Sequence, residues 1–502
     1  MTEKIIFWLN AYMLFFGLAH NLQKKYDCEQ YAIIDITNRT KKFFEEQNLV
    51  DFTKIWFLHD HIQNSKNIDI EYLKNFEKKY SINLWELGIN ERLFYQYNDF
   101  YQFSQDEILS ILEKECKLYE SILDEIKPDF LITSETALHQ QHLFYKMCRK
   151  KGIKVLMLNQ SKLAYKCIIS QELHELDEMP LLSDIPSQGR TFDELLKILT
   201  SKDNSKQLKL FEKSFGGNTS SKVKAASDYF LKSDNSNTKT HFSYYGRKKS
   251  KVFLDYISKS IKTKKRKSFI DKNLEFEVHN DEKYILFTLH QEPERSLLIA
   301  TPFYTNQLEV IRHIAKSIPP GYLLYVKEHF SQSLREWREI SYYKEILKIP
   351  NVRLYHPSSN IQKLIENSSF VISIGGTVSL EAAFYQKPSI IMSDMGFSIL
   401  PSVSKINSLD ELPVKIREGL DMKINPDDLD RYLSVLDEHS FELDLKEYEI
   451  NEANFFRHGG NFHDSEITNQ KMQLFLENSK MFFETLTKKY IEKIQKFKEK
   501  KI

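Results

Sequence analysis

Short apolar runs alternate with amphipathic segments along the first third of the chain. Strand-like runs cover residues 5–9, 32–36, 55–58, 130–133 and 155–158. Runs of this length and composition are typical of strands buried on both faces of a parallel sheet. Between them, residues 106–126 carry apolar side chains at helical spacing and end before Pro128, which disfavours helix in the residue preceding it. The pattern predicts βαβ units, with a mainly helical insertion over residues 69–101.

The same alternation returns after residue 280. Strands are predicted at 284–289, 323–327, 352–355, 370–374 and 389–392, and helices at 306–316, 334–347, 361–366 and 378–385. Five strands joined by four crossovers predict a doubly wound parallel sheet. The chain closes with apolar residues at helical spacing from Met472 to Phe497, which indicates one helix of about 30 residues.

These patterns predict an α/β protein with two Rossmann-like, doubly wound domains that face a cleft, with helical insertions and a closing C-terminal helix. The boundaries that we expect are an N-terminal domain at 1–170, a connecting, partly helical basic segment at 171–279, a second Rossmann-like domain at 280–425 and a C-terminal extension at 426–502.

Composition narrows the class of protein. The 502 residues are 41% hydrophobic with a mean hydropathy of −0.47, which excludes a wholly disordered chain. Lys and Arg number 71 against 70 Asp and Glu, so the whole chain has no field that would attract nucleic acid. Four cysteines occur singly, without a C-x-x-C pair, which favours a reducing, cytoplasmic location. The apolar residues 5–19 are too few for a membrane helix; a signal peptide is the less favoured alternative to a buried strand and helix.

One local patch departs from this balance. Lysines and arginines are concentrated from Arg247 to Lys267. Such a run is usually a solvated face; contact with anionic lipid headgroups or with an acidic polymer is the alternative. We therefore expect a cytoplasmic protein with a peripheral contact at the inner face of the cell membrane as one interpretation of this segment.

Ligands of doubly wound sheets bind beyond the carboxyl ends of the strands. The residues that follow the predicted strands of the second domain are polar or ionisable. They include His290 and Arg295 after the first strand, Lys327 and His329 at the end of the second, and Gly375 after the fourth. Lys327 and His329 are two residues apart, so both side chains are expected on one side of the backbone.

The turn after the fourth strand gives the sharpest signal. Gly375 and Gly376 allow close approach of a ligand, and Thr377 is expected to cap a helix whose first amides would face a phosphate. Ser379 lies in the same turn, and Glu381 lies one helical turn beyond Thr377, where its carboxylate could accept from ribose hydroxyls. The alternative is an ordinary tight turn with a buried Glu381.

The run from Tyr284 to Met392 resembles a known family. It contains Leu-His-Gln-Glu-Pro-Glu at 289–294, Val-Lys-Glu-His at 326–329, Gly-Gly-Thr at 375–377, Glu-Ala-Ala at 381–383 and Lys-Pro at 387–388. These motifs are similar to those of capsular and surface polysaccharide biosynthesis glycosyltransferases, which have the glycosyltransferase-B fold. More distantly, they resemble Kdo transferases, teichoic-acid glycerophosphotransferases and UDP-GlcNAc 2-epimerases.

The resemblance implies roles for individual residues. A nucleotide-activated sugar would bind the second domain, with its pyrophosphate at Gly375, Gly376 and Thr377 and its ribose at Glu381. Lys327 and His329 would lie near the phosphates or the departing nucleotide. From their positions alone, and not from the resemblance, we also assign His290, Arg295 and Ser379 to the donor site; a salt bridge with Glu292 or Glu294 is the alternative for Arg295. Glu328 separates Lys327 from His329 where several relatives have a His-Pro pair.

A transferase also needs a base for the acceptor hydroxyl, and we expect it from the first domain. Glu135, just after the strand at 130–133, is the first choice; the competitors are Asp35, His20, His59 and His61.

The sequence places no complete metal site. His139 and His142 share one helix face without further predicted ligands. The D-x-D pair at 428–430 lies at a predicted helix start instead of a strand end. We therefore expect neither metal nor cofactor, and a leaving diphosphate neutralised by Lys, His and amide donors.

The resulting hypothesis is an inverting, metal-independent glycosyltransferase. It would move a sugar from a nucleotide-sugar donor to a capsular or lipid-linked glycan acceptor, without a nucleic-acid partner. The alternatives are a nucleotide-sugar 2-epimerase, which needs a donor but no acceptor, and a non-catalytic glycan-assembly protein with the same fold.

Overall fold

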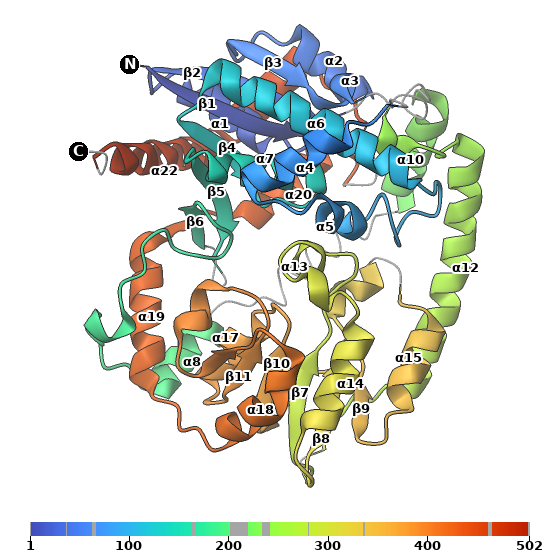
Figure 1. Cartoon of the computed structure of the whole chain (residues 1–502), viewed down its shortest axis with the longest axis vertical. Coiled ribbons are helices and arrows are strands. Elements are labelled where there is room, and N and C mark those ends of the chain that lie inside the picture. The colour runs from blue at the N-terminus through green and yellow to red at the C-terminus, as the bar shows by residue number, and fades with distance from the viewer. Residues whose placement is uncertain are drawn as a thin grey trace.

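The computed structural model describes residues 2–36, 38–62, 67–161, 166–200, 219–232, 241–279, 281–334, 337–459 and 464–499. Two separate sheets organise these residues into two lobes, the N-lobe and the C-lobe, which lie one above the other in Figure 1. Both are built from parallel strands with helices on both faces, so the predicted α/β fold class is confirmed.

The N-lobe sheet has seven strands in the order β13-β6-β5-β4-β1-β2-β3. Its five parallel strands, all predicted, are β1 (Glu3–Asn10), β2 (Cys28–Asp35), β3 (Lys54–Phe57), β4 (Phe130–Ser134) and β5 (Lys154–Gln160). Two antiparallel strands, β6 (Lys166–Ser170) and β13 (Phe441–Glu442), extend one edge. Neither strand was predicted, because β13 has only two residues and β13 pairs with β6 from a distant part of the chain.

The C-lobe sheet is entirely parallel, in the order β12-β11-β10-β7-β8-β9. Its strands are β7 (Tyr284–Thr288), β8 (Leu323–Lys327), β9 (Val352–Tyr355), β10 (Phe370–Ser373), β11 (Ser389–Ile391) and β12 (Val403–Lys405). Numbered within the lobe this is the Rossmann order 3-2-1-4-5-6. The sixth strand, β12, was not predicted, because its three residues lack an apolar run.

Both lobes reverse their strand order at one place. β1 lies between β2 and β4 in the N-lobe, and β7 lies between β8 and β10 in the C-lobe. The carboxyl ends of such central strands flank the crevice in which doubly wound proteins bind ligands. The loops after β1, β4, β7 and β10 are therefore the places to look for a site.

Helices bury both faces of the N-lobe sheet. One face is covered by α4 (Ile70–Tyr80), α5 (Leu84–Asn90), α6 (Gln105–Ile126) and α7 (His139–Lys150). The other is covered by α1 (Leu14–Leu22), α2 (Asn38–Glu46), α20 (Leu445–Phe456), α21 (Asn469–Asn478) and α22 (Lys480–Glu499). The C-terminal helix predicted as one element is thus two helices, which meet at Ser479.

The C-lobe sheet is covered in the same way. α14 (Gln307–Ser317), α15 (Ile340–Leu347), α18 (Leu412–Leu420) and the end of α12 (Lys249–Asn273) pack on one face. α8 (Phe192–Thr200), α16 (Ile361–Asn367), α17 (Val378–Phe384) and α19 (Pro426–His439) pack on the other.

The chain crosses between the lobes more than once. Segment 171–279 contributes α8 to the C-lobe core, while α12 runs along one side of both lobes (Figure 1). The extension 426–502 contributes α19 to the C-lobe and α20 to α22 to the N-lobe. Across the described ranges, no helix is both long and apolar enough to cross a membrane.

Candidate functional site

The loop after β7 belongs to the C-lobe and contacts the N-lobe where the two lobes face each other. It leads into the short helix α13 (Arg295–Leu298). Nε of Arg295 donates a 2.8 Å hydrogen bond to the carbonyl oxygen of Thr136 and lies 3.8 Å from Oε1 of Glu135. The Arg295 side chain is 13% exposed and that of Glu135 49%. Two predicted site residues from opposite domains therefore meet, one held in place and the other open to solvent.

The groups around this contact are polar and buried. Nδ1 of His142 lies 3.0 Å from the Thr136 hydroxyl. Burial, followed by the nearby charge of Arg295, lowers the pKa of His142 well below its usual value. The His142 ring is therefore neutral at physiological pH, and Arg295 supplies the positive charge at this edge.

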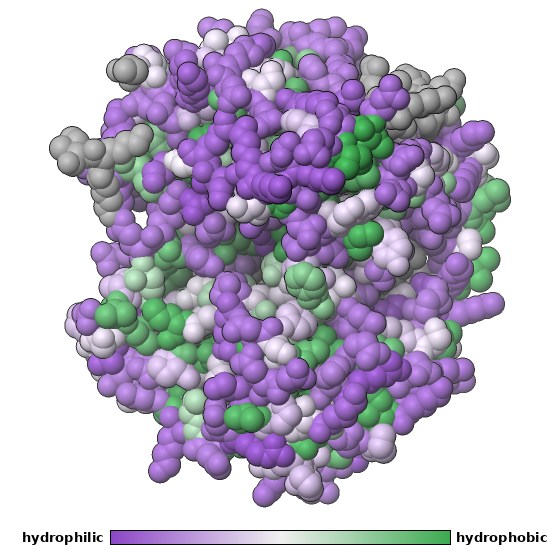
Figure 2. Space-filling model, in the orientation of Figure 1, coloured by the Kyte–Doolittle hydropathy of each residue, from purple (hydrophilic) through white to green (hydrophobic). Residues whose placement is uncertain are grey.

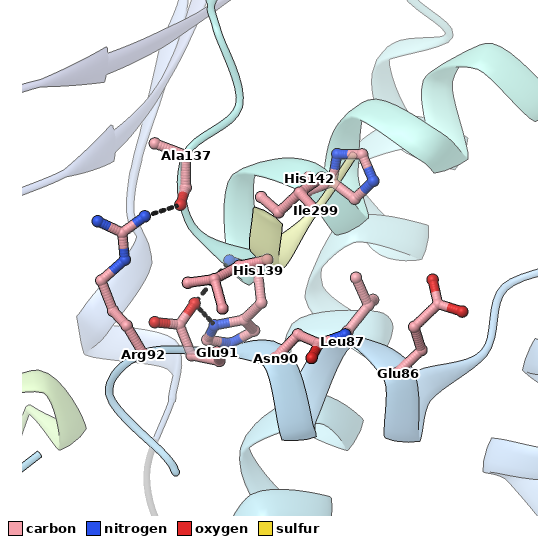
Figure 3. Close-up of a pocket in the computed structure, with 10 residues that line it drawn as sticks. Glu86, Leu87, Asn90, Glu91, Arg92, Ala137, His139, His142 and Ile299 are labelled. Carbon is pink, nitrogen blue, oxygen red and sulfur yellow. Dashed lines mark hydrogen bonds and ion pairs between the residues drawn. The ribbon is translucent and has the colours of Figure 1, made fainter. Parts of the chain in front are cut away.

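A pocket between the lobes lies next to α13. Its open space, counted with adjoining solvent, is about 350 Å³, and it is lined by the N-lobe helices α5 and α7 and by Leu298 and Ile299 of the C-lobe. Figure 3 shows Arg92 reaching the Ala137 carbonyl on one side of it, at 2.8 Å. Figure 2 shows a recessed band between the two halves of the molecule.

A buried ion network fixes the loop that carries Glu135. Nδ1 of His139 lies 2.9 Å from the Glu91 carboxylate, and Nε2 lies 3.1 Å from Glu115 (Figure 3 shows the Glu91 contact). The backbone amide of His139 also donates to Glu91, at 2.9 Å. Burial opposes a charge on His139, but Glu115 and Glu91 outweigh it and raise its pKa to about 10. The imidazolium therefore holds the start of α7, directly after Glu135.

Neither His139 nor His142 belongs to a metal centre in this structure. Both nitrogens of His139 face carboxylates, while His142 contacts Thr136. Across the described ranges, no group of three or more His, Cys, Asp or Glu side chains is arranged to hold a metal ion.

The glycine turn after β10 differs from the expectation. The amide of Gly375 donates to Nε2 of His290 at 3.1 Å, and the amide of Gly376 donates to the hydroxyl of Ser373 at 2.8 Å. Both amides thus have partners within the lobe in this structure, and their binding of a phosphate stays a prediction. His290 holds the turn in place through its ring.

Serine hydroxyls approach both glycines closely. A Cβ on Gly375 would lie 2.7 Å from the Ser393 hydroxyl, and one on Gly376 would lie 2.6 Å from the Ser373 hydroxyl. A larger residue at either position would therefore require the serine side chain to move. Ser393, whose buried hydroxyl has no hydrogen-bond partner among the described residues, was not anticipated from the sequence.

The residues after the glycines also depart from the prediction. Thr377 forms no cap; its hydroxyl donates to Oε1 of Glu381 at 3.1 Å. Ser379 is fully buried and donates to the Ile390 carbonyl at 3.4 Å, so its hydroxyl does not reach a ligand surface. Loss of solvent around the Glu381 carboxyl raises its pKa. Part of the Glu381 residue is nevertheless exposed at the surface.

At the end of β8, Lys327 and His329 lie close to each other but in different surroundings. Nζ of Lys327 is buried and donates to the carbonyls of Glu328 and Pro357 at 3.1 and 2.9 Å. Burial lowers its pKa to about 8. Nδ1 of His329 accepts from the Ser331 amide at 3.3 Å, which leaves the proton on Nε2. Burial, then Lys327 and Arg338, lowers the His329 pKa to about 4, so this ring is a neutral hydrogen-bond donor.

Glu328, a departure from the family pattern, has a structural role. It is fully buried and accepts from Nε of Arg338 at 2.9 Å and from the Tyr343 hydroxyl at 2.7 Å. Arg338 also pairs with Glu292 at 2.7 Å and donates to the His290 carbonyl. One buried arginine therefore ties together the loops after β7 and β8. No pattern in the sequence indicates this role of Arg338.

The competing candidates for the base are occupied or distant. Nε2 of His59 lies 3.0 Å from Oδ1 of Asp35, and both side chains are buried. His20 contacts the Leu49 carbonyl and Lys24 at the end of α1. His61 is exposed at the end of α3 (Leu58–His61). None of them contacts the loop after β7 in the interactions of the described residues.

Glu449 on α20 is a further acidic group near Glu135. Burial is the main cause that raises its pKa to about 7; Lys446 and Arg457 oppose this shift, while Asp444 and Glu135 add to it. More than 300 residues separate Glu449 from Glu135 in the chain, so sequence spacing could not reveal the pair.

A second pocket between the lobes, of about 340 Å³, lies at the end of β5. Asn159, Gln160 and Ser161 line it from the N-lobe, and Phe397 and Tyr432 from the C-lobe. The predicted glycine-turn residues line neither of the two pockets described here.

The protein is a two-lobed α/β protein with one Rossmann-ordered sheet in each lobe. Loops that follow strands of the two sheets meet through Glu135 and Arg295, so the candidate site lies between the lobes. Residues 186–411 match the family described as "capsule polysaccharide biosynthesis protein". The resemblance predicted from the sequence motifs is confirmed by this match. No curated protein matches the chain.

Several solved structures are similar to the chain at low identity. They include the UDP-GlcNAc 2-epimerase of Methanocaldococcus jannaschii in complex with UDP-GlcNAc and UDP (14% identity, 87% of this chain and 100% of that one, TM-score 0.25). The β-Kdo 2,7 transferase KpsC of Thermosulfurimonas dismutans matches at 12% identity over 67% of this chain and 88% of that one (TM-score 0.28). The N-terminal domain of trehalose-6-phosphate phosphatase from Candida albicans matches at 12% over 95% and 96% (TM-score 0.29). These similarities are too weak to say anything about the reaction.

Proposed function

We propose that the protein is a glycosyltransferase of surface polysaccharide assembly, which transfers a sugar from a nucleotide-activated donor to a glycan or lipid-linked acceptor. The single observation that carries the proposal is the contact between Glu135 and Arg295 across the facing edges of two Rossmann-ordered sheets. The match of residues 186–411 to capsule polysaccharide biosynthesis proteins supports the chemistry.

In the proposed reaction, the Glu135 carboxylate takes the proton of the acceptor hydroxyl. The acceptor oxygen then attacks the anomeric carbon of the sugar, and the bond from that carbon to the nucleotide phosphate oxygen breaks, with its electron pair leaving on the phosphate. A single direct displacement of this kind inverts the anomeric configuration. Glu135 suits the base because its side chain is half exposed at the interlobe edge.

The donor would lie against the C-lobe with its phosphate near Arg295 and Nε2 of His329. Arg295 is held by the Thr136 carbonyl, so its charge is already oriented before a ligand binds. The neutral His329 would donate a hydrogen bond to the leaving phosphate without giving up a proton. We propose that these groups act without a metal ion, and that Glu381 accepts from the ribose hydroxyls.

A thermal-shift panel of nucleotides and nucleotide sugars tests donor binding, because a ligand that binds only the folded protein raises its melting temperature. One class of nucleotide is expected to stabilise the wild type. Glu381→Ala is expected to weaken that nucleotide in a calorimetric titration, while Glu366→Ala, an exposed glutamate on the neighbouring helix α16, leaves it unchanged. Full affinity in Glu381→Ala would refute the ribose assignment.

Incubation with the donor alone separates the proposal from its alternatives. A transferase leaves the donor intact or hydrolyses it slowly, whereas NMR would detect the epimerised sugar made by a 2-epimerase. If no nucleotide or nucleotide sugar binds or turns over, the proposal fails. A protein partner bound through the basic segment 247–267 would then indicate a non-catalytic assembly protein.

A further inference from the structure

The outer face of α12 combines exposed apolar side chains with lysines. Leu254, Ile257 and Ile261 are 65, 41 and 52% exposed. Their spacing of three and four residues places Leu254, Ile257 and Ile261 along one side of the helix. In a soluble protein, such an apolar stripe normally faces the protein core. In α12, however, only Arg266 and Ile270 are buried.

The inner side of α12 is the more polar one. Asp255 and Lys259 form an ion pair at 3.2 Å, and Lys259 also reaches Asp99 of the N-lobe at 3.1 Å. Arg266 donates to the Trp337 carbonyl of the C-lobe at 2.7 Å. The helix is therefore tied to both lobes by polar contacts, while its apolar stripe faces away from them. Apolar side chains stand out at the edge of Figure 2 where Figure 1 places α12.

Lysines border this stripe. The helix carries nine basic residues and only two acidic ones. Arg247 and Lys251, at its start, are engaged by Phe100: the guanidinium of Arg247 lies 4.8 Å from the ring centre, and Lys251 donates to the Phe100 carbonyl. In contrast, Lys262, Lys264 and Lys265 form no ion pair within the described residues.

We propose that this face of α12 docks on the surface of an anionic lipid bilayer. An apolar stripe flanked by lysines is the pattern of helices that lie in the membrane interface, where apolar side chains enter the headgroup region and lysines contact anionic headgroups. Lys262, Lys264 and Lys265 would attract an anionic surface, whereas an uncharged or cationic partner would leave their charges uncompensated. The inference concerns binding alone and does not depend on the proposed transferase reaction.

Sedimentation with lipid vesicles tests the proposal on the full-length protein. The wild type is expected to bind vesicles of phosphatidylcholine mixed with phosphatidylglycerol, to bind pure phosphatidylcholine far more weakly, and to dissociate as salt is raised. Each lysine at an anionic surface contributes a factor of about five in affinity, so the triple variant Lys262→Gln, Lys264→Gln, Lys265→Gln is expected to bind on the order of 100-fold more weakly.

A second triple variant tests the apolar stripe. The variant Leu254→Ser, Ile257→Ser, Ile261→Ser is expected to lose at least tenfold in affinity for the mixed vesicles. It removes apolar side chains that would be buried in the membrane interface. The apolar control changes Val414, Leu474 and Met481, exposed side chains on α18, α21 and α22, to serine. The charge control changes Lys42, Lys480 and Lys488, exposed lysines on α2 and α22, to glutamine. Circular dichroism and the melting temperature check that each variant folds.

Three results would overturn the proposal. The first is a wild type that binds neither kind of vesicle. The second is equal binding by the wild type and both α12 variants. The third is a wild type that sediments as a dimer in solution, fails to bind vesicles, and becomes a monomer in the apolar variant; the stripe would then be an interface between two copies of the chain.

Discussion

A buried histidine holds the strand-end loop of each lobe, but by different chemistry. In the N-lobe, His139 is a charged ring between Glu91 and Glu115 and fixes the loop that carries Glu135. In the C-lobe, Nε2 of His290 accepts the Gly375 amide and closes the glycine turn. The charged anchor leaves its loop free to present a carboxylate to the interlobe edge, whereas the accepting anchor uses the amide that a ligand would otherwise bind. A glycine motif alone therefore does not identify a phosphate site.

The largest expected effect is on the charged anchor. His139→Leu leaves Glu91 and Glu115 buried without their cation, which is expected to cost about 3–5 kcal/mol of unfolding free energy. His313→Gln, a partly exposed histidine on α14, is the control. Because the folded pKa of His139 lies above its ordinary value, its contribution to stability is complete below about pH 6.5 and lost as the pH rises toward 10. Urea unfolding across this pH range measures the cost of the substitution and its pH dependence. A His139→Leu variant as stable as the wild type would show that the contacts of His139 with Glu91 and Glu115 do not stabilise the fold.

Glu135→Gln tests what the N-lobe loop presents. It removes the proposed base and is expected to lower kcat/KM for transfer on the order of 1000-fold, with donor affinity and melting temperature little changed. Glu438→Gln, an exposed glutamate on α19, provides a matched control. If Glu135→Gln keeps its activity, another residue is the base. If Glu135→Gln loses donor affinity, Glu135 has a binding role instead.

His290→Leu tests the anchor of the C-lobe. It leaves the Gly375 amide without its acceptor, which is expected to cost about 1–3 kcal/mol. His290→Gln, which keeps an acceptor, is expected to recover part of this loss. Chemical denaturation measures both variants; equal stability of His290→Leu and the wild type would show that the ring does not hold the turn.

The smallest expected effect concerns Glu449. Its folded pKa is raised to about 7, so its ionisation destabilises the fold as the pH rises from about 4.5 through 7. Glu449→Gln removes this penalty and is expected to raise the melting temperature at pH 8 by about 2–4 °C, with no change at pH 4.5. A lower melting temperature at pH 8 would mean that the carboxylate makes a favourable contact.

Prediction from sequence succeeded for the parts of the fold that local patterns determine. Parallel strands such as β4 and β10 are continuous apolar runs, and their ends can be read from the polar residues that follow. β13 and β12 escaped because two or three residues carry no periodicity. The split at Ser479 was missed because the apolar spacing continues on both sides of it.

The candidate site was only partly predictable for a related reason. Glu135 and Arg295 were named because each follows a strand, and the topology brings both to one edge. The partners of Gly375 depended on contacts between distant segments: His290 lies 85 residues away. Arg338 and Glu449 were missed because neither follows a predicted strand.

A crystal structure of the protein with the nucleotide selected by the thermal-shift panel would locate the donor site. We expect the nucleotide on the C-lobe beside Arg295 and His329, with its sugar-bearing phosphate directed toward Glu135. A nucleotide bound away from the edge where the two lobes meet would contradict this expectation.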